Sequence, residues 1–139
     1  MKYLHTPHRF LKHLPLLPFI TGALLFIFLL DIWVELYHRI AFPLYGFKYV
    51  KRRDYIKIDR HKLSYLHPFQ KINCIYCGYV NGALKYISEI VGETEKYWCG
   101  IKHAEREGFN PPAYHDEFLE YNDEDSFKKV YKSKKTRML

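Results

Sequence analysis

Three cysteines and one histidine have a spacing that suits metal binding. They follow the pattern C-x2-C, then 21 residues, then C-x3-H, and they are Cys74, Cys77, Cys99 and His103. Structural zinc takes four sulfur or nitrogen ligands in a tetrahedron, and three cysteines with one histidine are a common set. The sequence therefore predicts a Cys3His zinc site. Because four protein ligands leave no position open for water, catalysis at this metal is not expected.

Each half of this predicted site has its own geometric basis. Gly78, directly after the second cysteine, permits a tight turn in which both sulfurs face one point. Cys99 and His103 are four residues apart, so they would share one face of a helix. The apolar periodicity predicts an amphipathic helix over residues 79–97, and a second helix is expected over 97–107. These two elements would return the second pair of ligands to the first.

Other residues near the first cysteine pair leave alternatives open. Asp59, His61 and His67 precede that pair, and the favoured interpretation is that they are ordinary polar residues of a loop. The alternatives are that one of them replaces His103, that they support a ligand, or that they form a separate site. Iron is the alternative to zinc. A redox dithiol and inert buried thiols are the rival interpretations of the cysteines, although the sequence lacks the βαβ pattern that accompanies a thioredoxin-like dithiol.

Three short runs resemble a group of small uncharacterised bacterial membrane-associated proteins. They are DRH at 59–61, NCIYCGY at 73–79 and YWCGIKHA at 97–104. We associate no established activity with that group, so the resemblance implies none. The C-x2-C-G turn is also similar to the knuckles of zinc ribbons and rubredoxins. His103 stands where those proteins have another cysteine, which argues against electron transfer.

An apolar block near the N-terminus predicts a membrane helix. No charged side chain occurs from Leu14 to Leu30. A helix that spans a bilayer needs about 20 residues, and the block reaches this length only if Asp31 and Trp33 are included. No small-x-small cleavage motif follows it, which favours a retained segment over a cleaved signal peptide. We therefore predict a transmembrane helix over residues 14–36.

Two acidic residues stand at the inner end of this predicted helix. Asp31 and Glu35 are four residues apart, with His38 and Arg39 close behind as candidate partners. Acidic groups within a membrane are functional candidates by default. Their place near the edge favours a simple interfacial position.

The distribution of basic residues predicts the orientation. The excess of Lys and Arg follows the apolar block, which places the C-terminal part in the cytoplasm as a single-pass protein of the cell inner membrane. The N-terminus is also basic, so a re-entrant segment remains an alternative. Lys51, Arg52 and Arg53 form a juxtamembrane cluster that would contact anionic lipid headgroups. The net charge is +7, yet no nucleic-acid-binding motif accompanies it, so nucleic acid is not an expected partner.

Taken as a whole, the sequence predicts a mainly α protein with one N-terminal transmembrane helix and a small α-rich metal-knuckle domain. The expected segments are a basic N-terminus at 1–13, the membrane helix at 14–36, an interfacial and basic segment at 37–53, a cytoplasmic Cys3His domain at 54–127 and a basic disordered tail at 128–139. A short strand or an extended piece of chain is expected around 54–58. The predicted function is a membrane-anchored zinc-binding structural or interaction module, with the bilayer and a membrane protein as candidate partners. The alternative is a membrane-bound redox protein or enzyme that uses the first cysteine pair or a bound iron.

Overall fold

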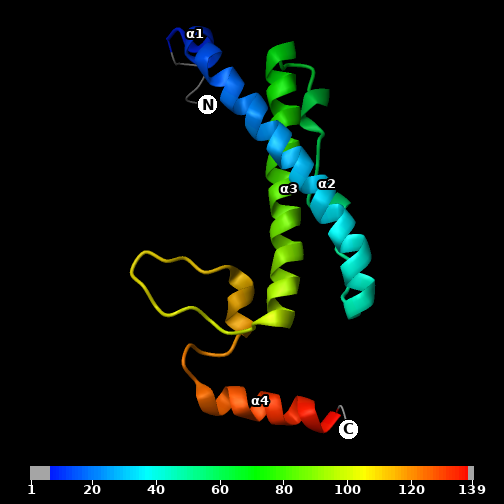
Figure 1. Ribbon diagram of the computed structural model, residues 1–139. Helices are drawn as coiled ribbons and strands as arrows, with labels where there is room; N and C mark the ends of the chain where they lie inside the picture. The colour runs from blue at the N-terminus through cyan, green and yellow to red at the C-terminus, as the bar shows by residue number, and fades with distance from the viewer. Residues whose placement is uncertain (1–6, 138–139) are drawn as a thin grey trace. The chain divides into compact units, whose positions relative to one another are not determined.

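The computed structural model describes residues 7–137 and shows a mainly helical protein (Figure 1). Its α-helices and 3₁₀ helices (η) are, in chain order, α1 Arg9–His13, η2 Leu14–Leu16, α2 Leu17–Tyr45, η3 Arg52–Asp54, η4 Arg60–Lys62, α3 Pro68–Trp98, η5 Ala113–Glu117 and α4 Glu124–Arg137. The described residues contain no strand, so the strand alternative for residues 54–58 is wrong. The chain divides into two compact units, residues 1–90 and 91–139.

Helix α2 is the long apolar helix that the sequence predicts. Pro18 lies in its first turn, where a missing N–H is tolerated. The helix ends at Gly46, whose φ of 70° is the left-handed conformation that commonly stops a helix. It therefore continues through Pro43, into the segment for which the sequence predicts an interfacial position. The helical stretch Leu11–Tyr45 is long and apolar enough to cross a membrane. Only 6% of its most apolar 18-residue segment is buried within the structure. Because a core helix of a soluble protein is mostly buried, this stretch does not resemble one.

Helix α3 packs one stripe of side chains against α2 and against the segment between the two helices. Phe42 of α2, Val50 of the connecting segment, and Tyr86 and Ile90 of α3 form the buried cluster of the first unit. The amphipathic helix predicted over 79–97 is confirmed as the larger part of α3. The structure begins this helix earlier, at Pro68, a residue type suited to a helix start.

Two glycines of α3 allow the connecting segment to approach closely. A Cβ on Gly82 would lie 2.8 Å from the Tyr55 carbonyl oxygen and from the Ile56 Cα, and a Cβ on Gly78 would lie 3.0 Å from the Lys57 carbonyl oxygen. Atoms this close to backbone would force the segment away from the helix. Gly78 is therefore explained by helix packing rather than by the predicted knuckle turn.

The second unit contains the last turns of α3, η5 and α4. The backbone of Leu119 lies beside the residue pair Gly100 and Lys102, with two N–H···O bonds of 2.8 Å. His115 and Phe118 are its buried side chains. Asp123 precedes α4 and accepts a hydrogen bond from the Ser126 N–H at 3.0 Å, which is the contact of a helix N-cap.

Three further predicted features differ in the structure. The expected helix over 97–107 is wrong, because α3 ends at Trp98 and Gly100 takes a φ of 65°. The basic segment expected to be a disordered tail is helical in α4 as far as Arg137, and residues 138–139 lie outside the described part. Since the C-x2-C run is helical within α3, the structure shows a helical protein without the predicted metal knuckle in its described residues.

Candidate functional site

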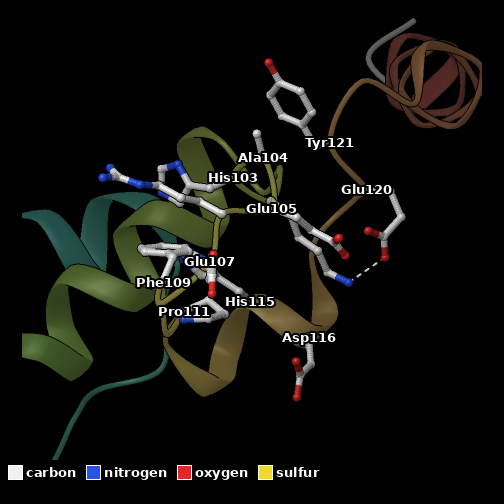
Figure 2. Close-up of a pocket in the computed structure, with 12 residues that line it drawn as sticks. His103, Ala104, Glu105, Glu107, Phe109, Pro111, His115, Asp116, Glu120 and Tyr121 are labelled. Carbon is white, nitrogen blue, oxygen red and sulfur yellow. Dashed lines mark hydrogen bonds and ion pairs between the residues drawn. The ribbon is translucent and has the colours of Figure 1, made fainter.

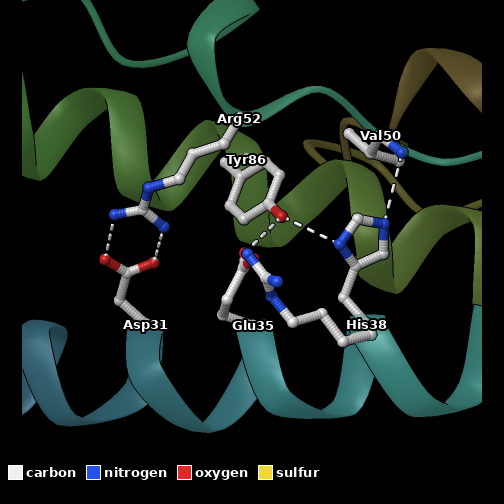
Figure 3. A network of polar contacts seen from close by, with 7 residues as sticks. Asp31, Glu35, His38, Val50, Arg52 and Tyr86 are labelled. Carbon is white, nitrogen blue, oxygen red and sulfur yellow. Dashed lines mark hydrogen bonds and ion pairs between the residues drawn. The ribbon is translucent and has the colours of Figure 1, made fainter.

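A cluster of polar side chains lies where α2, α3 and their connecting segment meet (Figure 3). Asp31 on α2 is 4% exposed. Its two carboxylate oxygens accept hydrogen bonds from the two terminal nitrogens of Arg52, and Oδ2 also accepts the Tyr79 hydroxyl hydrogen at 2.7 Å. A buried carboxylate is costly unless it is paired and hydrogen-bonded, and a bidentate guanidinium with a hydroxyl meets both needs.

The second half of the cluster lies one helical turn further along α2. Glu35 accepts a hydrogen bond from Arg39 at 2.8 Å and from the Tyr86 hydroxyl at 2.7 Å. The Tyr86 oxygen lies 2.9 Å from His38 Nδ1, and the Val50 N–H donates to His38 Nε2 at 3.2 Å. Because Nε2 accepts, Nδ1 carries the proton and donates to Tyr86. The hydrogen bonds therefore run in one direction, from Val50 to Glu35.

The electrostatics of the partners from α3 and the connecting segment agree with this geometry. Hydrogen bonding to Asp31 raises the pKa of Arg52, which remains charged at any accessible pH. Burial, reinforced by the bond to Asp31, raises the pKa of Tyr79 to about 12. Burial and the bond to Glu35 raise the pKa of Tyr86. The Arg52 guanidinium also lies 5.5 Å from the centre of the Tyr86 ring, so it contacts both halves of the cluster.

Helical spacing brings these side chains together. Asp31, Glu35 and His38 follow one another at four and three residues, which places them on one face of α2. Tyr79 and Tyr86 are seven residues apart, which places both on one face of α3. The polar atoms that face each other are paired between elements. The arrangement therefore acts as a joint that holds α3 and the connecting segment to α2.

The first predicted metal pair lies within α3. Cys74 is half-buried and Cys77 is exposed, and both have free thiols. They are three residues apart on a continuous helix, so they lie near the same face of it. Among residues 7–137 no group of three or more His, Cys, Asp and Glu side chains is placed to hold a metal ion.

The second predicted pair follows the end of α3. Cys99 is exposed, and His103 lies in the loop that precedes η5. Helix α3 continues through almost all of the 21 residues that separate Cys77 from Cys99. The zinc site therefore stays a prediction from the spacing of these four residues.

The alternative ligands are not part of any metal-holding group of three or more side chains in the described part of the chain. Asp59 forms an ion pair with Lys57 at 3.4 Å. His67 is exposed, and its ring stacks on Phe69 with 5.6 Å between centroids. The Nδ1 atom of His61 is buried and has no hydrogen-bond partner among the described residues.

The three residues predicted to contact lipid headgroups differ in their surroundings. Lys51 is exposed. The side chain of Arg53 is 84% exposed and lies 3.9 Å from Asp54. Arg52 instead donates two hydrogen bonds to Asp31, so it has a structural role that the spacing of charges does not reveal.

The second unit contains an open pocket of about 790 Å³, lined by residues between Lys102 and Tyr121 (Figure 2). His115 lies at its edge, is 3% exposed and places its Nε2 3.2 Å from Glu95 Oε1. The Tyr114 hydroxyl donates to the same carboxylate at 2.8 Å, and this bond is the main reason for the lowered pKa of Glu95. The ring of His103 lies 5.6 Å from that of His115. Here His103 adjoins another histidine rather than a cysteine.

The structure defines the chain as a mainly helical protein with one long apolar N-terminal helix. Comparison with protein-family models, with curated proteins and with solved structures finds no match to it. Functional inference therefore depends on the geometry of the chain itself.

Sequence reasoning found part of the polar cluster and missed the rest. His38 and Arg39 were the candidate partners of the two acids. Arg39 pairs with Glu35, whereas Asp31 pairs with Arg52 and Tyr79. A signal for the missing partners was present in the sequence. An acidic residue in an apolar helix needs a partner, and the tyrosines at 79 and 86 repeat at the seven-residue spacing of one helical face.

Proposed function

We propose that this protein is a membrane-anchored interaction module. In this proposal α2 crosses the cell inner membrane once, and the C-terminal unit is held in the cytoplasm. The observation that carries the proposal is the combination of an apolar helix whose surface is left uncovered with a paired polar joint at its C-terminal half.

The exposed surface of α2 is large and apolar. Its side chains with at least half of their surface exposed include Phe19, Leu25, Phe26, Phe28, Leu29, Ile32 and Trp33. Contiguous apolar surface of this extent is rare on soluble monomers, and it fits the hydrocarbon region of a bilayer.

The polar joint supports the same arrangement. A carboxylate near a bilayer is tolerated when a partner neutralises it, and Asp31 has both a guanidinium and a hydroxyl. Basic side chains follow α2 and stay exposed at Lys48, Lys51 and Arg53. Their position after the apolar segment favours a cytoplasmic C-terminus.

Zinc binding and the redox alternative are separate from this proposal. Both rest on the spacing of Cys74, Cys77, Cys99 and His103 alone. Elemental analysis of the purified chain tests the zinc prediction, for which about one zinc per chain is expected. Iron with visible absorption would favour the alternative metal.

Carbonate extraction and thiol labelling test the anchoring and the orientation. After expression in a bacterial host, the full chain should stay in the carbonate-washed membrane pellet. Because Cys77 and Cys99 are exposed, a membrane-impermeant maleimide should label them only after the inner membrane is permeabilised. Release by carbonate would overturn the anchoring, and labelling in intact spheroplasts would overturn the orientation.

A cysteine at an exposed N-terminal position separates a single crossing from a re-entrant segment. His8 is exposed and precedes α2. In a chain with all three native cysteines changed to serine, His8→Cys should be labelled in intact spheroplasts if α2 crosses once. Labelling only after permeabilisation would instead place both ends in the cytoplasm. The cysteine-free chain provides the background signal.

A further inference from the structure

The contacts within the first unit show that α2 and α3 run in the same direction. Asp31 contacts Tyr79, and Glu35, one turn later on α2, contacts Tyr86, two turns later on α3. Residue numbers therefore increase together along both helices. Figure 1 shows the same relation, since the N-terminal ends of α2 and α3 lie on the same side of the point where the helices cross.

This parallel arrangement gives the first turns of α3 an unusual position. Phe69 precedes Tyr79 by ten residues, which corresponds to about 15 Å of helix. Ten residues before Asp31, α2 consists of uncharged and mostly apolar side chains. The first turns of α3 thus lie on the side of the joint where α2 carries its membrane segment.

The side chains of these turns form an exposed apolar stripe. Phe69 is 64% exposed, Ile72 is 61% exposed and Ile75 is 42% exposed. Their three-residue spacing keeps them near one face of the helix. Tyr65, just before α3, adds a fourth large side chain that is 78% exposed.

The charge around this stripe has a single sign. No Asp or Glu occurs from Arg60 to Tyr79, whereas Arg60, Lys62 and Lys71 are basic. Arg60 and Lys62 are exposed next to the start of α3. An apolar stripe accompanied by basic groups and no acidic ones is the pattern of a helix that lies at an anionic lipid surface.

We propose that Phe69, Ile72 and Ile75 form a second contact with the membrane, in which the first turns of α3 insert into the headgroup region of an anionic bilayer. We assign lipid as the partner of these side chains because they lie on the side of the polar joint where α2 enters the bilayer. This inference rests on the proposed membrane anchoring by α2. It adds that the connecting segment and the start of α3 return to the same membrane surface.

Fluorescence quenching by lipids tests this contact in the full chain. The native cysteines are changed to serine, and a bimane label is attached to a single cysteine in nanodiscs of phosphatidylglycerol that contain doxyl-labelled lipid. The three labelled variants are Phe26→Cys on α2, Ile72→Cys in the stripe and Leu84→Cys as the control. Leu84 matches the stripe in being apolar and 45% exposed on α3, but it follows Tyr79.

The proposal predicts that labels at positions 26 and 72 lose emission to the doxyl lipid, whereas the label at 84 does not. Quenching at 26 without quenching at 72 would overturn the second contact and leave the anchoring intact. Absence of quenching at 26 would overturn the anchoring itself. If the label at 72 escapes quenching but self-quenches as copies per disc increase, the stripe binds a second copy and the lipid assignment is wrong.

Discussion

At the residue scale, the carboxylates of the two units derive their properties from the hydroxyl groups that face them. Tyr79 and Tyr86 each donate to an acid on α2, and Tyr114 donates to Glu95 in the second unit. A hydrogen bond to a charged group contributes about 1.5–3 kcal/mol, more than one between neutral groups. Removal of a tyrosine hydroxyl should therefore have a measurable effect on stability.

Tyr79→Phe should destabilise the first unit by about 1.5 kcal/mol at neutral pH, because Asp31 keeps Arg52 but loses the hydroxyl. The pKa of Tyr79 is raised to about 12, so its contribution is complete below about pH 10, the ordinary range of tyrosine, and is lost as the pH rises toward 12. Chemical unfolding in detergent micelles, followed by circular dichroism, measures the difference. A difference that stays constant from pH 8 to about 12 would contradict this assignment.

Glu95→Gln should weaken the second unit at neutral pH. The Tyr114 hydroxyl and the nearby His115 lower the pKa of Glu95, so the stability that it contributes is present above the ordinary glutamate pKa of about 4.3. That contribution is lost as the pH falls through the lowered pKa. The emission of Trp98 in a Trp33→Phe chain reports the unfolding. If wild type and variant differ by the same amount at low and neutral pH, Glu95 does not have this role.

At the scale of elements, close backbone packing holds the connecting segment against α3. The approach at Gly82 is the tightest in the first unit, and it involves the backbone of Tyr55 and Ile56. Backbone atoms cannot rotate away as a side chain would. The segment that carries Arg52 to Asp31 therefore depends on a residue without a side chain.

Gly82→Ala should destabilise the protein by about 1–3 kcal/mol, the usual cost of overpacking, despite the better helix propensity of alanine. Gly22→Ala on α2 is the matched control, because a Cβ there would have no atom within 4 Å. The control should cause no loss of stability. Thermal unfolding of both variants in micelles provides the comparison, and equal midpoints would contradict the packing described for Gly82.

Cys99→Ser tests whether the second unit requires a metal. The Cys99 thiol is exposed and donates a long hydrogen bond to the Ile101 carbonyl oxygen at 4.0 Å. We expect the variant to retain its helical content and its unfolding midpoint, with a change below about 0.5 kcal/mol. Unfolding of this unit by the substitution, or by a chelator, would instead support the predicted Cys3His site.

The sequence predicts α2 and most of α3, but not the first turns of α3. The uncharged run from Leu14 to Leu30 predicts α2, and the apolar periodicity after Tyr79 predicts most of α3. The first turns of α3 were missed because Cys74, Cys77 and Gly78 suit a metal turn as well as a helix. Local composition does not decide between these forms. The packing of the connecting segment against Gly78 does, and that contact is not visible in the order of residues.

The polar joint shows the same limit. The pairing of Glu35 with Arg39 follows from their spacing on one helix, and Arg39 is among the partners that the sequence offers for the two acids. The pairing of Asp31 with Arg52 and Tyr79 joins residues 21 and 48 positions apart, so it depends on how α2, α3 and their connecting segment pack. Interactions within an element were thus accessible from the sequence, whereas interactions between elements were not.

At the scale of the whole molecule, the proposed anchoring and the polar joint form one account. A helix in the bilayer positions the rest of the chain only if the two are firmly connected. Asp31 and Arg52 are the central connection, since they join α2 to the segment that leads into α3. The account therefore depends on energetic coupling between these two side chains.

A double-mutant cycle on Asp31→Asn and Arg52→Gln in bilayer nanodiscs tests this claim most directly. Each single variant leaves one partner unpaired, so we expect a loss of about 2 kcal/mol, less than for a fully buried pair because the Arg52 side chain is 37% exposed. Arg53→Gln, the neighbouring exposed arginine, should have no effect. The account predicts that the double variant is less destabilised than the sum of the singles, with a coupling energy of about 1–2 kcal/mol. Strict additivity of the two substitutions would contradict it.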